Sequence, residues 1–421
     1  MRNDAASPRR AWLWVSAAYL FQAIPAAVRD EALPVALKNG GYGDASITRA
    51  VALLGLIFGF KILLAPLVAA FRPRSFIIFA EVCISALLGT LAFQVSVNPS
   101  SALPIIILLV LLSFFAAAHD FALDGYFVAS LNDHTRATHS GLLNFTSKLG
   151  LVLAGPGLVW LAGRIMDFGP QTADAWSWAL AAATMLALTT AFLNWLGLRR
   201  EANVEGDANT IGLRYTEMRR GLLALARDVR VPALLGLIFF YRASEIHMAR
   251  ILPLFATDRI HGGLALDNET YAIMRIATAV AGLAIGGVIG SQVVARLGLA
   301  RALVPMGIVM HAPLLAVAWL AGADHHSSFQ ICAVFFIEYL AYGAGLCALL
   351  LAMMKVAAGP GAAVRYAALS TCALLANYLP GLWAGHLAES LGYTHYFLFA
   401  LFLAIPGIAS AWVAKRHFEE A

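Results

Sequence analysis

The residues with the clearest chemical potential lie in the stretch AAAHDFALDGYF, residues 116–127, where Asp120 and Asp124 interrupt an apolar run. Residues four apart share one face of an α-helix, so the two carboxyl groups should point the same way. Close carboxylates repel each other, and one of them then binds a proton more readily than an isolated acid does. The stretch predicts a pair that takes up and releases a proton as a unit. A static ion-pair network with Lys61 or Lys148 is the structural alternative.

Other ionisable residues also stand well inside apolar runs. A charge at mid-membrane costs roughly 3 kcal/mol, so these side chains must face a protein interior or a wet cavity. Besides the two aspartates they are Lys61, Lys148, Arg242, Glu245 and Glu338. The set holds one acid more than it holds basic residues, unless Arg275 reaches inward instead of the outer interface. Arg242 and Glu245 are three residues apart and are also candidates to pair with each other.

The elements that position these residues are membrane-spanning helices. The chain has 421 residues, of which 61% are hydrophobic and 13% charged. Apolar runs of about 20 residues recur along its whole length, as expected of transmembrane helices. We predict an all-α membrane protein with twelve spans at 11–36, 46–70, 75–96, 102–130, 137–163, 176–198, 231–256, 268–295, 300–321, 328–354, 362–388 and 394–414.

The longest polar stretch divides the spans into two groups of six. We therefore expect an N-terminal six-helix bundle at 1–198, a cytoplasmic linker at 199–230 and a C-terminal six-helix bundle at 231–421. Seven arginines lie in this linker, whereas the loops on the opposite side carry only Lys38, Arg49, Arg164 and Arg259. Because positive residues concentrate on the cytoplasmic side, both termini should be cytoplasmic.

Two six-span halves suggest the major facilitator architecture, which holds a substrate between its halves near the membrane midplane. The charges fit this arrangement, because acids recur in spans one, four, seven and ten. Span three, expected to be peripheral, has only Glu81, near its cytoplasmic end. In span eleven, Asn377 before Pro380–Gly381 marks an expected break.

These placements assign expected roles. Asp120 and Asp124 are the candidates for proton coupling, with Glu338 as the next candidate. Residues expected to bind substrate are Arg242, Glu245, Lys148, Asn144 and Lys61. Arg242 and Lys148 should hold an anionic group, and Asn144 adds a polar group one turn before Lys148.

The sequence gives little support to a nucleic-acid-binding protein, a metalloprotein or an enzyme. The net charge of +5 belongs to the segments between spans and gives no sign of nucleic-acid binding. The four cysteines form no CxxC pair, and we expect neither a metal nor a cofactor. A membrane-embedded enzyme or receptor remains a remote alternative, since the chain has no HExxH, no nucleophile elbow and no phosphate-binding loop.

The sequence resembles the AmpG-type permeases, a branch of the major facilitator superfamily that also includes acetyl-CoA transporters. The segment HDFALDGYFVASLNDHTRATHSGLLNFTSKLGLVLAGPGLVWLAG is similar to the span-four signature of that family, as are GFKILLAPL, FFIEYLAYGAG and GHLAESLGYTHYFLFALFLAIPG to its second, tenth and last spans. The chain departs from the pattern at Ala69, where an Asp is usual, and at Lys148, where Arg is frequent.

The resemblance implies a transporter that imports a small-molecule cargo across the bacterial inner membrane, together with protons. Cell-wall muropeptides are the first expectation for the cargo, and siderophores and CoA thioesters are the alternatives. It also implies a monomer whose partners are the cargo, protons and the lipid bilayer.

Overall fold

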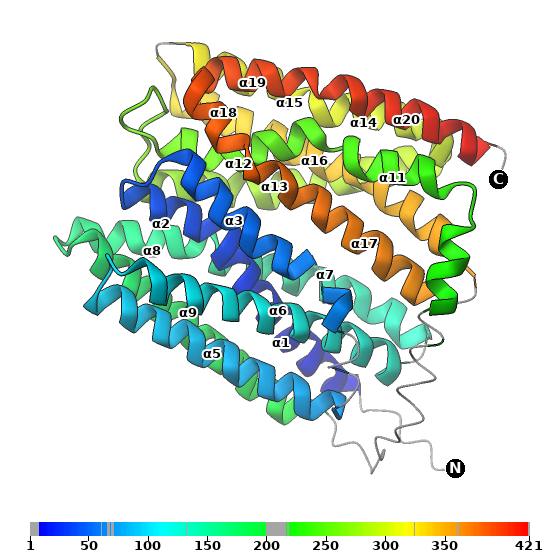
Figure 1. Ribbon diagram of the computed structural model, residues 1–421, viewed down its shortest axis with the longest axis horizontal. Helices are drawn as coiled ribbons and strands as arrows, with labels where there is room; N and C mark the ends of the chain where they lie inside the picture. Colours follow the sequence, from blue (N-terminus) through cyan, green and yellow to red (C-terminus); the bar gives the residue numbers. More distant parts are fainter. Residues whose placement is uncertain are drawn as a thin grey trace. The chain divides into compact units, whose positions relative to one another are not determined.

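The computed structural model describes residues 8–59, 61–64, 68, 71–131, 133–198, 216, 219–323, 325–359 and 362–419. Within these residues the chain consists of helices and contains no β-strand. It divides into two compact units, which are coloured by sequence in Figure 1. Unit 1 comprises residues 1–40 and 57–213, and unit 2 comprises residues 41–56 and 214–421.

Unit 1 holds the helices of the first half of the chain. They are α1 (Pro8–Ala27), the π-helical turn η1 (Val28–Ala32), α2 (Leu33–Asn39), the 3₁₀ turn η2 (Lys61–Leu64), α5 (Pro73–Val97), α6 (Ala102–Ser130), α7 (Asp133–Ala154), α8 (Pro156–Asp167) and α9 (Thr172–Gly197). Helix α3 (Asp44–Gly59) begins in unit 2 and ends in unit 1.

Unit 2 holds the remaining helices. They are α11 (Val231–Phe240), α12 (Ala243–Thr257), α13 (Asn268–Leu297), α14 (Leu299–His311), α15 (Pro313–Gly322), α16 (Ser328–Ala357), α17 (Ala362–Tyr378), the 3₁₀ turn η3 (Leu379–Leu382), α18 (Ala384–Leu391), α19 (Tyr393–Phe402) and α20 (Ala404–Glu419).

Local sequence signals explain where the longest helices of unit 2 begin. Asp267 caps α13, because its side chain accepts a hydrogen bond from the backbone N–H of Thr270. Ser327 and Gln330 form a capping box at the start of α16. Pro313, at the first position of α15, separates it from α14 within one span, since proline cannot supply the N–H that a continuous helix needs there.

The two cores are built by different residue types. In unit 1, α5 packs against α6 and α9, while α1 packs against α7 and contributes Trp14, whose ring meets Tyr126 edge-on at 5.1 Å. In unit 2, α13 packs against α16 through glycines at four-residue spacing. A Cβ added at Gly286 or Gly290 would overlap the backbone of α16, so only glycine permits this close approach.

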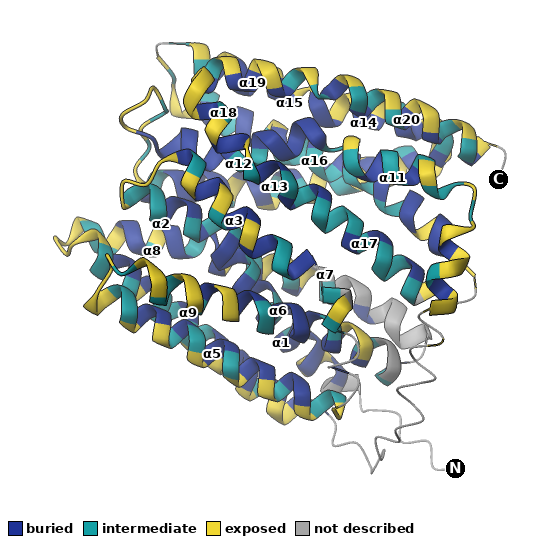
Figure 2. Cartoon of the chain, in the orientation of Figure 1, coloured by how far each residue is buried: buried dark blue, intermediate teal, exposed yellow. Residues whose placement is uncertain are grey.

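Nine of the twelve predicted spans contain a helical segment long and apolar enough to cross a membrane, within the described part of the chain. Figure 2 shows exposed residues along the outer faces of these helices, and large apolar side chains such as Phe79, Phe93 and Phe192 are among them. An apolar outer surface of this kind suits contact with lipid chains.

The other three predicted spans contain no such segment within the described residues. The span predicted at 231–256 is broken between α11 and α12, at Tyr241 and Arg242. The span predicted at 362–388 is broken by η3, which confirms the expected break at Pro380–Gly381. The span predicted at 46–70 contains α3 and η2, with residues outside the described part between and after them.

Most of the segment predicted as a linker, at 199–230, lies outside the described residues. Its last part is described and is helical at 219–226. Residues 41–56, which the sequence groups with the first bundle, are grouped with unit 2 by their contacts.

Candidate functional site

Asp120 and Asp124 lie on the same side of α6 but have different surroundings. Asp120 is buried and forms an ion pair with Lys61 of η2. Its second oxygen accepts a hydrogen bond from the side-chain amide of Gln22 on α1. Both oxygens of Asp120 therefore have a donor partner, and one of these partners is a cation. The sequence suggested Lys61 or Lys148 as ion-pair partner of the aspartates, and the structure shows the pair with Lys61.

Asp124 is the exposed member of the pair. The hydroxyl of Tyr19 on α1 donates to its Oδ1 at 3.3 Å. A phenol carries no charge, so this contact does not neutralise a carboxylate as Lys61 neutralises that of Asp120. The two aspartates are thus unequal: Asp120 is paired with a cation, whereas Asp124 is bonded to a neutral phenol beside a like charge.

In unit 2, Arg242 and Glu245 pair with each other. The Arg242 Nε lies 2.9 Å from Glu245 Oε2, and the guanidinium lies over the ring of Tyr342, 5.1 Å from its centroid. Arg242 stands where the helix is interrupted between α11 and α12, so its position is set by a break in a membrane span. Discontinuous helices of this kind form polar binding sites in many membrane proteins.

Arg275 and Glu338 form a second pair in unit 2. Their Nη1 and Oε2 atoms are 2.9 Å apart, and 5% and 4% of the two side chains are exposed. The guanidinium also lies 4.3 Å from the centroid of the Tyr339 ring. Arg275 therefore points inward, toward α16, and supplies a partner for Glu338. An acid neutralised in this way is a weaker candidate for proton exchange than Asp124.

The two remaining residues of the predicted set lie on α7. Lys148 is exposed there. The side chain of Asn144 lies outside the part of the chain that the structure describes. The roles expected for both in substrate binding stay predictions.

Several polar contacts involve residues that sequence reasoning did not select, namely Tyr19, Gln22 and Tyr342. Tyrosine and glutamine carry no charge, so a selection based on charged residues inside spans does not include them. His247 was missed as well: its Nδ1 donates to the carbonyl of Ala243 at 2.8 Å, and its Nε2 accepts from the indole of Trp383 at 3.2 Å. These two contacts fix His247 as a neutral tautomer.

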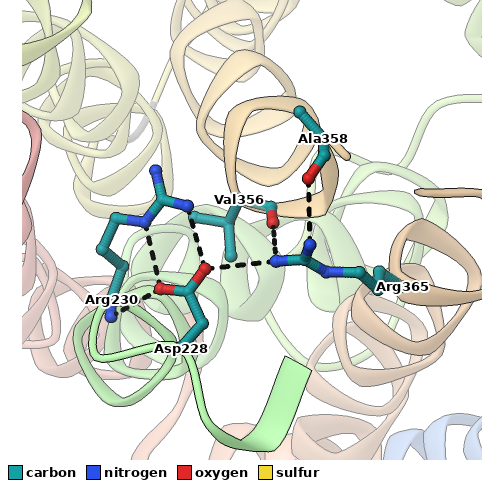
Figure 3. Close-up of polar contacts among 5 residues, drawn as sticks. All are labelled: Asp228, Arg230, Val356, Ala358 and Arg365. Carbon is teal, nitrogen blue, oxygen red and sulfur yellow. Dashed lines mark hydrogen bonds and ion pairs between the residues drawn. The ribbon is translucent and has the colours of Figure 1, made fainter. Parts of the chain in front are cut away.

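A separate charged cluster lies at the linker end of unit 2 (Figure 3). Asp228 accepts hydrogen bonds from Arg230 and lies 3.1 Å from Arg365. The side-chain hydrogen bonds from Arg230 lower the pKa of Asp228 to about 2. Arg365 also donates to the carbonyls of Val356 and Ala358, and so satisfies groups at the C-terminal end of α16. The cluster joins the end of the linker segment to α16 and α17.

Among the described residues, no group of three or more His, Cys, Asp and Glu side chains is arranged to hold an ion. All four cysteines are free.

Comparison with solved structures defines the class of fold. A bacterial homologue of the human lysosomal transporter Spinster matches 99% of this chain and 98% of its own with a TM-score of 0.73 at 16% identity. The D-xylose–proton symporter matches 96% of this chain and 97% of its own with a TM-score of 0.70 at 14% identity. The chain therefore has the major facilitator transporter fold, as expected from its two groups of six spans.

Comparison with curated sequences gives more specific relatives. Putative transporter AmpG 4 of Rickettsia conorii is 25% identical over 91% of this chain and 92% of its own length. The anhydromuropeptide permease of Escherichia coli K12 is 23% identical over 87% of this chain and 72% of its own length. No family model matches the chain. These relatives bear out the resemblance to AmpG-type permeases, and they are transport proteins rather than enzymes.

Proposed function

We propose that this chain is a secondary transporter of the bacterial inner membrane that imports a small-molecule cargo by alternating access. One observation carries the proposal: the chain has a major facilitator fold, and both of its units hold ion pairs inside spans that are otherwise apolar. Buried ionisable groups in membrane spans are costly and are characteristic of substrate and ion pathways. Similarity to permeases over about nine-tenths of the chain supports the same class.

The cargo we propose is a muropeptide, the sugar–peptide fragment released by cell-wall turnover. Two relatives with AmpG or anhydromuropeptide permease names support this choice. The chemistry of unit 2 is compatible with it, because a peptide offers carboxylate groups to Arg242 and an ammonium group to Glu245. A zwitterion can exchange for the internal Arg242–Glu245 pair without leaving either charge buried and unpaired.

The driving force we propose is proton symport through the Asp120–Asp124 pair. Asp120 is paired with Lys61, whereas Asp124 is exposed and bonded to a neutral phenol. A proton on Asp124 relieves its repulsion with Asp120, and a change of exposure or an incoming cargo charge then releases it. Glu338 is the second candidate for the proton, after the aspartates.

The direct test of cargo is uptake into liposomes that contain only this protein. We expect labelled anhydromuropeptide to accumulate under an inwardly directed proton gradient. Arg242→Gln should raise the half-saturating concentration about tenfold or more, because one charge-assisted hydrogen bond to the cargo is lost.

Removing Arg242 also leaves Glu245 buried without its cation, so Arg242→Gln/Glu245→Gln serves as the folding control. Unchanged uptake by Arg242→Gln at sub-saturating cargo would reassign the arginine to a structural pair. Transport of a ferric siderophore or a CoA thioester in preference to the muropeptide would overturn the choice of cargo.

A further inference from the structure

Three polar side chains meet inside unit 1 behind the aspartate face of α6. They are Glu81 of α5, His119 of α6 and Asn194 of α9, and each is at most 1% exposed. Helix α5 packs against both other helices (Figure 1). The Asn194 Nδ2 donates to Glu81 Oε1 at 2.6 Å, and His119 Nε2 lies 3.2 Å from the same oxygen. The sequence placed Glu81 in a peripheral span near its cytoplasmic end, where such enclosure is unexpected.

Two further oxygen atoms of this cluster, one on Glu81 and one on Asn194, do not fit an ionised glutamate. In the described structure, Glu81 Oε2 and Asn194 Oδ1 are both buried and neither has a hydrogen-bond partner. Both atoms are acceptors when the acid is ionised, so they cannot satisfy each other. A proton on Oε2 turns one of them into a donor and leaves the other as its natural acceptor. A carboxylic acid and a primary amide already joined by one bond can then close a second.

The charges around Glu81 also favour a protonated, neutral acid. Within the described residues, the ionisable side chain in hydrogen-bond contact with it is His119. The next acid on α6, Asp120, is directed to Lys61 and Gln22 instead. An ionised Glu81 would need a protonated His119 as its counter-ion, and a buried pair of that kind carries a large desolvation cost. A neutral acid and a neutral imidazole avoid this cost.

We propose that Glu81 is a neutral carboxylic acid that binds one proton, and that it positions the aspartates of α6. Its hydroxyl donates to Asn194 Oδ1, while its carbonyl oxygen accepts from Asn194 and from the N–H of His119. Because His119 immediately precedes Asp120, the cluster fixes the rotation of α6 that brings Asp120 to Lys61. The consequence for transport rests on the proposed function, but the protonation state does not.

Infrared spectroscopy of the protein in lipid membranes tests the protonation state without any transport assay. At neutral pH, Glu81→Gln should remove a carbonyl band of a protonated carboxylic acid. Glu245→Gln is the matched control: Glu245 is paired with Arg242, so this variant should remove carboxylate absorption and leave the acid band in place. Loss of carboxylate absorption in Glu81→Gln, with the acid band intact, would overturn the proposal.

Uptake tests the positioning role. Glutamine copies a protonated glutamic acid, because its N–H₂ replaces the O–H as donor to Asn194 Oδ1. Glu81→Gln should therefore transport within about twofold of the natural protein, with the same pH profile, whereas Glu81→Leu should lose about tenfold or more and shift the pH of half-maximal uptake. If Glu81→Gln abolished proton-driven accumulation, Glu81 would be a proton carrier, and the positioning role would be wrong.

Discussion

The polar interiors of the two units differ in how their acids are neutralised. In unit 2, Glu245 and Glu338 each lie 2.9 Å from an arginine, and both pairs are largely buried. In unit 1, Lys61 is bonded to Asp120, while Asp124 is exposed and bonded to an uncharged phenol. Buried pairs resist a change of charge, because removing one partner strands the other in a low-dielectric interior. These differences support the proposal that unit 2 provides cargo contact and structural support and that unit 1 carries the exchangeable charge.

The largest expected effect on stability comes from breaking the pair between α13 and α16. Arg275→Gln leaves Glu338 buried without its cation, and we expect a loss of about 3 kcal/mol or more. The measurement is thermal unfolding in detergent. The double variant Arg275→Gln/Glu338→Gln should recover most of the loss, since a neutral amide replaces the stranded charge.

The matched variant in unit 1 is Asp124→Asn, which also replaces a charged side chain by a neutral amide. Because Asp124 is exposed and has no cation bonded to it among the described residues, its melting temperature should stay close to that of the natural protein. Equal destabilisation by Arg275→Gln and Asp124→Asn would show that the two units do not differ in how strongly their folding depends on paired charges.

A smaller loss of stability than at Arg275 is expected at the linker end of unit 2, in the cluster of Figure 3. The pKa of Asp228 is held at about 2, below the value of about 3.9 for an unfolded chain. Its contribution to stability is therefore complete above about pH 5 and is lost as the pH falls toward 2. Asp228→Asn should be less stable than the natural protein by about 1 kcal/mol at pH 7.

The difference between Asp228→Asn and the natural protein should shrink below about pH 4, when thermal unfolding is followed from pH 7 to pH 3. Glu419→Gln is the control, because the Glu419–Lys415 pair is more exposed and spans one helical turn. An Asp228→Asn defect that is constant down to pH 3 would mean that the carboxylate charge is not what stabilises the cluster.

The fold was largely predictable, because the length and low polarity of membrane spans can be read directly from the sequence. Nine spans contain a helical segment long enough to cross a membrane, and the break at Pro380–Gly381 followed from residues that cannot continue a helix. The break at Tyr241–Arg242 could not be predicted, since neither residue is a helix breaker. At this break Tyr241 is buried, and its hydroxyl donates to backbone carbonyls of α14 and α16, contacts that lie far away in the sequence.

The candidate site was predictable in its charges but not in their pairing. Spacing was enough to suggest Arg242 with Glu245 and Lys61 with α6. Arg275 could have reached either the interior or the interface, because a long side chain near the end of a span has both options. The direction of Glu81 depended on Asn194, more than a hundred residues later in the chain, and no local pattern reveals such a contact.

The central claim is that Asp124, in its unequal pair with Asp120, carries the proton that drives uptake. The most direct measurement is cargo accumulation in liposomes containing Asp124→Asn, under an imposed proton gradient and in exchange against preloaded cargo. We predict that this variant exchanges cargo but does not accumulate it above equilibrium, because asparagine keeps the size and hydrogen bonding of aspartate without its ionisable group. Accumulation at the normal rate in both Asp124→Asn and Asp120→Asn would contradict the account and move the proton site elsewhere, with Glu338 as the next candidate.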